Sequence, residues 1–357
     1  MTIEADVRTA LNDPTSRRTE EGAMMKAWRS HQAGGPESLV LEDVPVPEPT
    51  GDEILVKIQG VGINFPDGLF LRDLYQVKPP RPLVPGSEFS GIVAKTGPAA
   101  TDFAVGDPVI GRCGWGAMAH YLALSQGKCV RLPESLPRVE AAAFQFVYAT
   151  AYHALHDQAA LRPGETLLVL GAAGGVGTAA VELGHAMGAK VLACASSQAK
   201  VDHALARGAA GGFVYAADLS AGDAQKALAA QLKTLAPGGV DVVIDPVGGA
   251  YAEPALRSLR RGGRHLVIGF TAGIPRVPLN LTLLKSTRII GVDWRTFVNE
   301  EPEHNARNVA ALLDLWKAGK IAPKVTEVYA FDQAPAAIER LESRQAIGKI
   351  VVTIADR

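Results

Sequence analysis

The chain has 357 residues, 47% of them hydrophobic, which is enough material for two domains with sizeable cores. Its formal net charge of −1 provides no general basic surface for nucleic acid or an anionic membrane. No apolar run approaches the roughly 20 residues that span a bilayer. Three scattered cysteines cannot form a disulfide framework, so we expect a cytoplasmic protein in a reducing environment.

Residues 1–23 are polar and lack a sustained periodicity, which predicts a flexible extension before a folded part that begins near Met24. The segment that follows is rich in β-branched residues, proline and glycine. Alternation of Ile54, Val56 and Ile58 is typical of a strand with one buried face. Repeated Pro and Gly separate further short strands, so this part predicts a loop-rich, barrel-like β module.

The character of the chain changes near Glu140, where residues 140–159 are alanine-rich and predict a helix. Pro163 and Gly164 break the chain before the segment 166–190, TLLVLGAAGGVGTAAVELGHAMGAK. This segment combines a short buried-strand pattern, a glycine-rich turn and a helical spacing of apolar residues. The order of strand, turn and helix is the context in which such glycines bind a dinucleotide.

In the dinucleotide-binding fingerprint the first small residue makes the turn, the second lets the backbone approach the pyrophosphate, and the third lets the helix pack closely on the strand. Ala172, Gly174 and Gly177 occupy these three places. The N–H groups that open the helix, near Gly175 and Val176, would face the anion. The segment therefore predicts a nucleotide site, with a loop that only reverses the chain as the alternative.

Strand-like and helical segments alternate beyond the glycine loop. The predicted strands are residues 191–194, 212–215, 241–244, 265–269 and 288–292. Helical patterns that end in glycine lie between some of them, at residues 198–208, 223–239 and 252–263. This alternation predicts a doubly wound α/β fold with a parallel sheet, in which the ligand lies at the carboxyl ends of the strands.

The alternation stops after Val292. The later elements are predicted as a helix at 302–320, a strand at 325–329, a helix at 335–343 and a strand at 349–354. Because these elements are too many to form one further βαβ unit, we expect this segment to return to the β module. The predicted domains are therefore 24–146 together with 293–357, and an inserted 147–292, with the active site in the cleft between them.

Several blocks of the sequence resemble the medium-chain dehydrogenase/reductase superfamily, and within it the zinc-free quinone oxidoreductase, or zeta-crystallin-like, branch. The blocks are GINFPDGLFLRDLY, VPGSEFSGIV, the glycine-loop segment, VDVVIDPVGG, LVIGFTAG and AIGKIVV, which occur in the order that the family has. The resemblance implies a GroES-like, β-rich catalytic domain and a Rossmann domain.

Zinc alcohol dehydrogenases of this architecture carry a metal-binding cysteine in the first block and Gly-His-Glu in the second. Here Asn64 stands in the place of the cysteine, and Ser87 and Glu88 stand in the place of His-Glu. We therefore predict no metal. Without a Lewis acid an unactivated ketone is a poor hydride acceptor, so the predicted substrate is a quinone or an α,β-unsaturated carbonyl compound. The alternatives are an enoyl thioester reductase and a noncatalytic NADPH-binding sensor.

An NAD site usually has an acidic residue about 20 residues after the first glycine. This chain has Ser196, Ser197 and Lys200 there, and no acid before Asp202. Hydroxyl groups and a lysine suit the 2′-phosphate of NADPH, which a carboxylate would repel. In the resembled branch a lysine and a tyrosine at the positions of Lys200 and Tyr215 bind that phosphate. We predict NADPH, with a solvated lysine and an ordinarily packed tyrosine as the alternatives.

Reduction of a conjugated carbonyl needs a hydride from the nicotinamide, a group that stabilises the oxyanion, and a proton. The resemblance implies that Asn64 lies beside the nicotinamide, where its amide could donate, and that Tyr75 lies near the substrate as an orienting donor. Aromatic packing at a domain rim is the alternative for Tyr75, and Leu69 replaces a second tyrosine of some relatives. Asp67 is a third catalytic candidate, although we prefer it as a cap of its loop.

The resemblance adds four positions around the cofactor, namely Thr150, Phe270, Thr271 and Lys349. The first three are expected at the nicotinamide end. The fourth is expected to reach a phosphate, unless it is a solvated strand lysine.

Two further features bear on metals and assembly. His153 and His156 have the spacing of a metal-binding pair, but no third ligand is evident, so we expect ordinary packing. Apolar strand material at residues 277–294 predicts an unpaired sheet edge, and relatives in the resembled branch commonly dimerise there. We therefore expect a homodimer that acts on a small molecule.

Overall fold

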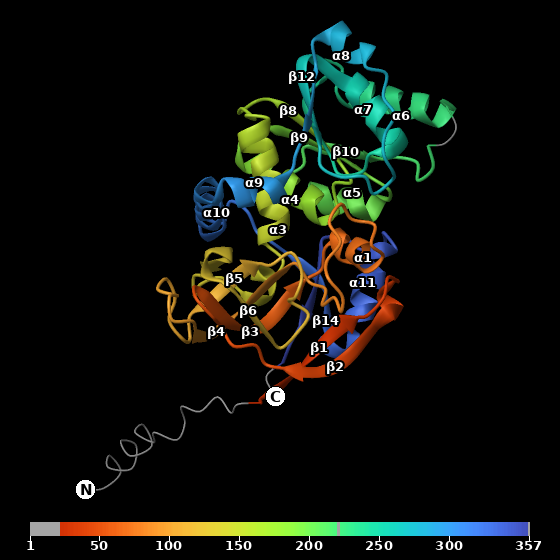
Figure 1. Ribbon diagram of the computed structural model, residues 1–357. Coiled ribbons are helices and arrows are strands. Elements are labelled where there is room, and N and C mark those ends of the chain that lie inside the picture. Colours follow the sequence, from red (N-terminus) through yellow and green to blue (C-terminus); the bar gives the residue numbers. More distant parts are fainter. Residues whose placement is uncertain (1–21, 220–221, 356–357) are drawn as a thin grey trace, which may run out of the picture.

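A computed structural model describes residues 22–219 and 222–355 of the chain (Figure 1). Most of the predicted extension, residues 1–23, lies outside the described residues. The described chain contains two large β-sheets and a separate two-stranded hairpin. In Figure 1 one large sheet occupies the lower half of the molecule and the other, with most of the helices, the upper half.

The lower sheet has seven strands, in the order β14-β15-β3-β4-β5-β7, with β6 also paired to β3. Its strands are β3 (Glu53–Gly62), β4 (Glu88–Thr96), β5 (Pro108–Arg112), β6 (Tyr121–Ser125), β7 (Cys129–Arg131), β14 (Val325–Ala330) and β15 (Lys349–Thr353). β15 runs antiparallel to β3, with Val352 opposite Val61, so strands from late in the chain complete a sheet begun early in it. The hairpin consists of β1 (Met24–Ser30) and β2 (Leu39–Pro45).

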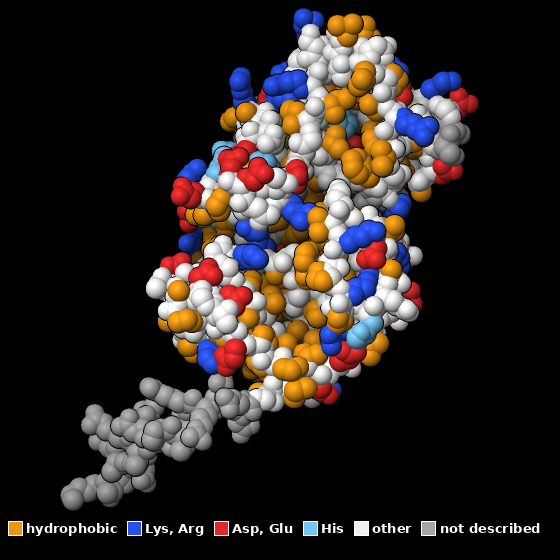
Figure 2. Space-filling view, viewed as in Figure 1, with side chains coloured by type: hydrophobic (Ala, Val, Ile, Leu, Met, Phe, Trp, Pro, Cys, Tyr) orange, Lys and Arg blue, Asp and Glu red, His pale blue; other side chains and the backbone are white. Residues whose placement is uncertain are grey.

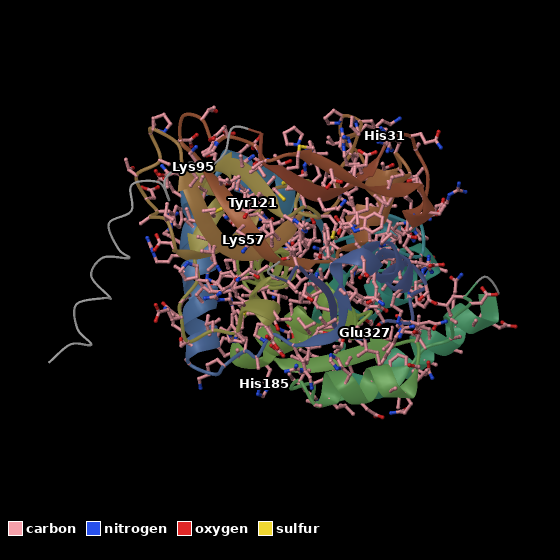
Figure 3. The ribbon with its side chains drawn as sticks, turned by 90° about the horizontal axis from the view of Figure 1, so that it is seen from below. His31, Lys57, Lys95, Tyr121, His185 and Glu327 are labelled. Carbon is pink, nitrogen blue, oxygen red and sulfur yellow. The ribbon has the colours of Figure 1, made fainter. Side chains whose placement is uncertain are left out.

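β3 pairs with three strands and supplies much of the lower core. Ile54, Val56 and Ile58, which were predicted to share a buried face, are all buried. Lys57 is only half-buried and is the register partner of Tyr121 on β6, and the two side chains lie close together in Figure 3. Burial of the apolar positions on both sides of Lys57 fixes the register of this strand.

The upper sheet has six parallel strands in the order β10-β9-β8-β11-β12-β13. They are β8 (Thr166–Leu170), β9 (Lys190–Ala195), β10 (Gly211–Val214), β11 (Val240–Asp245), β12 (Leu259–Val267) and β13 (Arg288–Gly291). The helices between them include α4 (Gly175–Ala186), α5 (Gln198–Leu205), α6 (Gly222–Leu235) and α7 (Ala252–Ser258). Together with the lower sheet, this confirms the predicted class: a β-rich module plus a doubly wound parallel sheet. The strand order reverses between β8 and β11, where such sheets bind their ligands.

The turn between β8 and α4 requires glycine at two positions. Gly171 has a φ of +59°, in the left-handed region that favours glycine. Gly177 lies so close to the carbonyl oxygen of Gly171 that a Cβ atom would overlap it. Gly174 is the N-cap of α4, and its N–H donates to the same carbonyl (3.0 Å). The first N–H groups of α4 lack acceptors within the helix, so they are available to an anion at this edge.

Two predicted helices differ from those observed. The helix predicted at 140–159 is divided into α2 (Arg138–Ala141), α3 (Gln145–Tyr152) and a π-helical segment, η4 (His153–Gln158). The prediction of a helix at 252–263 is wrong for its second half, because α7 ends at Ser258 and β12 follows. Leu259 is fully buried opposite Val240, and Arg260 forms an ion pair with Asp241. Tertiary burial in the sheet therefore outweighs the helical pattern of this stretch.

The remaining helices lie around and between the sheets. They are α1 (Phe65–Leu71), α8 (Asn280–Lys285), α9 (Trp294–Glu300), α10 (Pro302–Lys317) and α11 (Ala334–Glu342). The amphipathic pattern at 302–320 correctly predicts α10, which packs Trp316 against Phe144 with ring centroids 4.7 Å apart. None of the helices in the described part of the chain is long and apolar enough to cross a membrane.

Candidate active site

The loop between β3 and α1 is closed by a capping box. Asn64 is the N-cap of α1, and its backbone N–H donates to Asp67 Oδ2 (2.7 Å). Asp67 Oδ1 accepts a longer bond from the N–H of Gly86 (3.3 Å). The side chain of Asp67 is fully buried, and this burial raises its pKa to about 7. These contacts support the interpretation of Asp67 as a residue that braces the loop.

The carboxamide of Asn64 points into the protein rather than towards solvent. Its Nδ2 donates to Glu88 Oε1 (2.9 Å) and makes longer contacts with Gly62 O (3.3 Å) and Ser87 Oγ (3.4 Å). Glu88 Oε2 accepts the backbone N–H of Phe146, in the first turn of α3 (2.8 Å). Asn64 and Glu88 are 4% and 1% exposed, so the residues that stand in the places of the cysteine and of the glutamate of zinc alcohol dehydrogenases form a closed hydrogen-bonding cluster.

Lys349, at the start of β15, completes this cluster. Its Nζ donates to Ile63 O (2.8 Å), Asn64 Oδ1 (2.7 Å) and Glu88 Oε1 (3.0 Å). The side chain is 7% exposed, so the alternative of a solvated strand lysine is wrong. Its stem passes the glycine loop, because a Cβ atom on Gly175 would lie 3.0 Å from Lys349 Cδ. The contact with a cofactor phosphate stays a prediction.

Tyr75 lies after α1 in a half-buried aromatic group. Its ring meets Phe70 edge-on with centroids 4.7 Å apart, and Phe70 in turn contacts Trp115 (6.0 Å). Burial raises the pKa of Tyr75, and Arg295 and Asp293 at the start of α9 act on it with opposite signs. The phenol is therefore protonated at neutral pH and faces charges from a distant part of the chain. Sequence reasoning missed Arg295, for which no motif gave a signal.

The residues predicted to recognise the 2′-phosphate follow β9. Lys200 Nζ donates to Ser196 Oγ (3.2 Å) and to the backbone carbonyl of Arg344 (2.7 Å). Burial lowers the pKa of Lys200, and the nearby Arg340 acts in the same direction. Ser197 is the N-cap of α5. Sequence reasoning missed the approach of Arg344, which is 144 residues from Lys200 in the chain.

Tyr215 lies beneath the glycine loop. It is buried, its ring packs on Tyr251 with centroids 4.7 Å apart, and the nearby backbone of Gly171 acts to lower its pKa against the larger effect of burial. Burial raises its pKa. The structure thus supports a role of Tyr215 in holding the loop, and its predicted contact with a phosphate stays a prediction.

The positions predicted at the nicotinamide end, Thr150, Phe270 and Thr271, all belong to the segment 147–292. Thr150, on α3, is buried and donates its hydroxyl to Phe146 O (2.6 Å). Thr271, in the loop after β12, donates to Pro246 O (3.2 Å), and its own carbonyl accepts Nη2 of Arg344. Phe270 beside it is exposed. Phe270 and Thr271 thus follow the carboxyl end of β12, on the same edge of the parallel sheet as the glycine loop after β8.

The two histidines with metal-like spacing pack as expected. Asp157 binds both of them, with distances of 2.7 Å from Oδ2 to His153 Nδ1 and 2.7 Å from Oδ1 to His156 Nδ1. The ring of His153 stacks on Phe297 with centroids 3.9 Å apart. Across residues 22–219 and 222–355, no group of three His, Cys, Asp or Glu residues is arranged to hold a metal ion.

The two-part fold, with a glycine loop between β8 and α4 at the switch point of the parallel sheet, is that of a medium-chain dehydrogenase/reductase, and family models agree. Residues 50–134 match the alcohol dehydrogenase GroES-like domain, and residues 212–352 match the zinc-binding dehydrogenase model. The chain belongs to the medium-chain dehydrogenase/reductase superfamily, in its quinone oxidoreductase branch. It is therefore an oxidoreductase that uses a nicotinamide cofactor.

Individual relatives place the chain within this branch. It is 35% identical to quinone oxidoreductase-like protein 2 of Bos taurus over 318 residues, which cover 88% of this chain and 89% of that one. It is 30% identical to the quinone oxidoreductase of Homo sapiens, over 93% of this chain and 98% of that one. The structure of Escherichia coli quinone oxidoreductase complexed with NADPH matches with a TM-score of 0.84 and 28% identity, over 92% of this chain and 99% of that one.

Proposed function

We propose that this protein transfers hydride from NADPH to a quinone or an α,β-unsaturated carbonyl compound without a metal. The observation that carries the proposal is the buried cluster of Asn64, Glu88 and Lys349, an amide and an ion pair built around the residue that the resemblance puts in the place of a metal-binding cysteine. An ammonium group at this position opposes the entry of a divalent cation. A substrate that accepts hydride through its own conjugation does not need one.

The residues around the glycine loop fit NADPH better than NADH. The free N–H groups of the first turn of α4 suit a pyrophosphate. Lys200 and Ser196 form a small polar cluster after β9, in which the Lys200 ammonium also donates to the backbone carbonyl of Arg344 from the other half of the molecule. We assign this cluster to the 2′-phosphate. Relatives named quinone oxidoreductase and a similar structure that contains NADPH support the assignment.

In the proposed reaction the cofactor, when bound, supplies the hydride, and the protein supplies orientation and a hydrogen-bond donor. The amide N–H groups of Asn64 are directed at Glu88 and Ser87, so Asn64 holds the loop under the substrate. Tyr75 carries a protonated phenol in a half-buried apolar group. We assign Tyr75 as the donor that stabilises the developing oxyanion, and solvent as the source of the proton. Figure 2 shows the surface hollowed between the two halves, with hydrophobic and basic side chains at its border.

The test measures the rate of NADPH oxidation with three classes of substrate: small quinones, simple enones, and enoyl-CoA. Turnover with quinones or enones but not with enoyl-CoA supports the proposal. Preference for enoyl-CoA would favour the thioester reductase instead. Binding of NADPH without turnover of any panel would indicate a sensor.

We further propose that residues 24–146 and 293–357 form one domain and residues 147–292 the other. We also propose that the protein is a cytoplasmic homodimer. β13 is the last strand of the upper sheet, and among the described strands it has no neighbour on its outer side. Leu283 and Leu284 of α8 and Ile289 of β13 are exposed beside this edge. Figure 2 shows hydrophobic side chains at the top of the molecule, where Figure 1 places α8. Pairing of two β13 edges would bury these side chains.

A further inference from the structure

Lys349 connects three segments that are far apart in the chain. Its ammonium group binds Ile63 and Asn64 in the loop before α1, and Glu88 at the start of β4. The N–H of its neighbour Gly348 donates to Ala173 O in the glycine loop (2.7 Å). One side chain and one backbone bond thus join the catalytic loop, the lower sheet and the cofactor-binding turn.

The ammonium group has no hydrogen-bonding capacity left. A lysine ammonium has three N–H donors, and each of them meets an oxygen atom at 2.7–3.0 Å. The acceptors are one carboxylate, one amide oxygen and one backbone carbonyl. A cofactor phosphate could bind this group only if one of these bonds broke, so the geometry argues against a phosphate as its ligand.

The buried charges of Lys349 and Glu88 stabilise each other and are costly to remove singly. Glu88 is the carboxylate in contact with the ammonium, and it is further satisfied by Asn64 Nδ2 and the N–H of Phe146. Asp67 also faces the ammonium, which acts to lower the pKa of that carboxyl against the larger effect of burial. Removing one partner of a buried ion pair leaves an unpaired charge, whereas removing both can be nearly neutral.

We propose, on the basis of the proposed function, that Lys349 is a positioning residue. It holds the Asn64 carboxamide and the loop that leads into α1 in a fixed position relative to the glycine loop. The ammonium fixes Asn64 Oδ1, so that the amide nitrogen faces Glu88 and the start of α1 is held. Because α1 leads directly to Tyr75, the placement of the substrate donor depends on this contact. Lys349 therefore acts on the reaction through Asn64 and Tyr75 and does not bind the cofactor phosphate.

The test compares Lys349→Met, Glu88→Gln and the double variant in the full chain. Lys349→Met leaves Glu88 buried without its cation and is expected to be unstable, whereas the double variant removes both charges at nearly constant volume. For the double variant we expect kcat to fall about tenfold or more, with the Kd for NADPH, measured by fluorescence titration, within about threefold of the parent. Lys200→Ala is the matched reference, since it removes a lysine assigned to the phosphate.

A second measurement does not depend on turnover. Amide hydrogen exchange of residues 64–71 should be faster in the double variant than in the parent, because the loop loses its anchor. Unchanged exchange with unchanged kcat would overturn the positioning role. A rise of tenfold or more in the Kd for NADPH, at unchanged kcat, would instead show that Lys349 binds the cofactor. If the parent binds NADPH but reduces no quinone or enone, the proposed function fails, and the exchange result still decides the role of Lys349.

Discussion

Replacement of Lys200 by alanine should reduce the preference of the protein for NADPH, so that NADPH and NADH bind with more similar affinity. Lys200 Nζ lies 3.2 Å from Ser196 Oγ, in a half-buried position where the side chain is already held by the carbonyl of Arg344. An ammonium group about 4 Å from a phosphate gains roughly 1 kcal/mol in bulk water and roughly 4 kcal/mol near a protein surface. Because Lys200 is partly exposed, we expect Lys200→Ala to lose binding free energy for NADPH between these limits, about 1.5–3 kcal/mol.

That loss corresponds to a rise of about 10-fold to 150-fold in the Kd for NADPH, with a change of less than about twofold for NADH, which lacks the 2′-phosphate. Fluorescence titration with both cofactors measures the two values, and added salt should narrow the difference between parent and variant. Lys190→Ala removes the same charge at the other end of β9 and serves as the control. Equal effects of Lys200→Ala on the two cofactors would refute the assignment of the phosphate site.

Three further predictions concern Tyr75, Asp67 and Leu283. Tyr75→Phe should lower kcat/KM for enones about tenfold, or about 1.4 kcal/mol, with Tyr121→Phe as the control; an unchanged value removes Tyr75 from the mechanism. Burial raises the pKa of Asp67 from its ordinary value near 4 to about 7, so its contribution to stability is complete below pH 4 and is lost as the pH rises through 7. Denaturant unfolding of the parent and of Asp67→Asn should therefore show a stability difference that is smaller at pH 8 than at pH 5, and a constant difference contradicts this. Leu283→Asp should yield a monomer in light scattering, whereas Leu205→Asp on α5 should not; dimers of both variants would place the interface elsewhere.

The glycine loop and the doubly wound sheet could be predicted from the sequence because their determinants are local. Gly171 and Gly177 are required by a turn and a close contact within seven residues of each other. Strand and helix periodicity then repeats with each βα unit. The end of α7 was not predictable in this way, because Leu259 leaves the helix to pair with Val240 across the sheet, a contact that no local pattern encodes.

The sequence identified residues of the candidate site, but it could not identify their contacts. Asn64 and Glu88 were identified by the places they occupy in two sequence blocks, which lie 24 residues apart. The ammonium of Lys349 reaches them from 285 and 261 residues away. Sequence reasoning gave Lys349 only a phosphate or solvent as its partner, since the fold alone brings β15 beside β3. Arg344 escaped prediction for the same reason.

The place of β15 in the lower sheet has a consequence for synthesis on the ribosome. β15 lies inside the sheet, between β14 and β3, although it is made some 290 residues after β3. The six strands of the upper sheet are continuous in the chain, and its core is complete once α9 and α10 have followed β13. β6 covers residues 53–57 of β3, but residues 60–62 must wait for their partner on that side until residues 349–353 arrive. During this interval that short unpaired edge is exposed to wrong pairing.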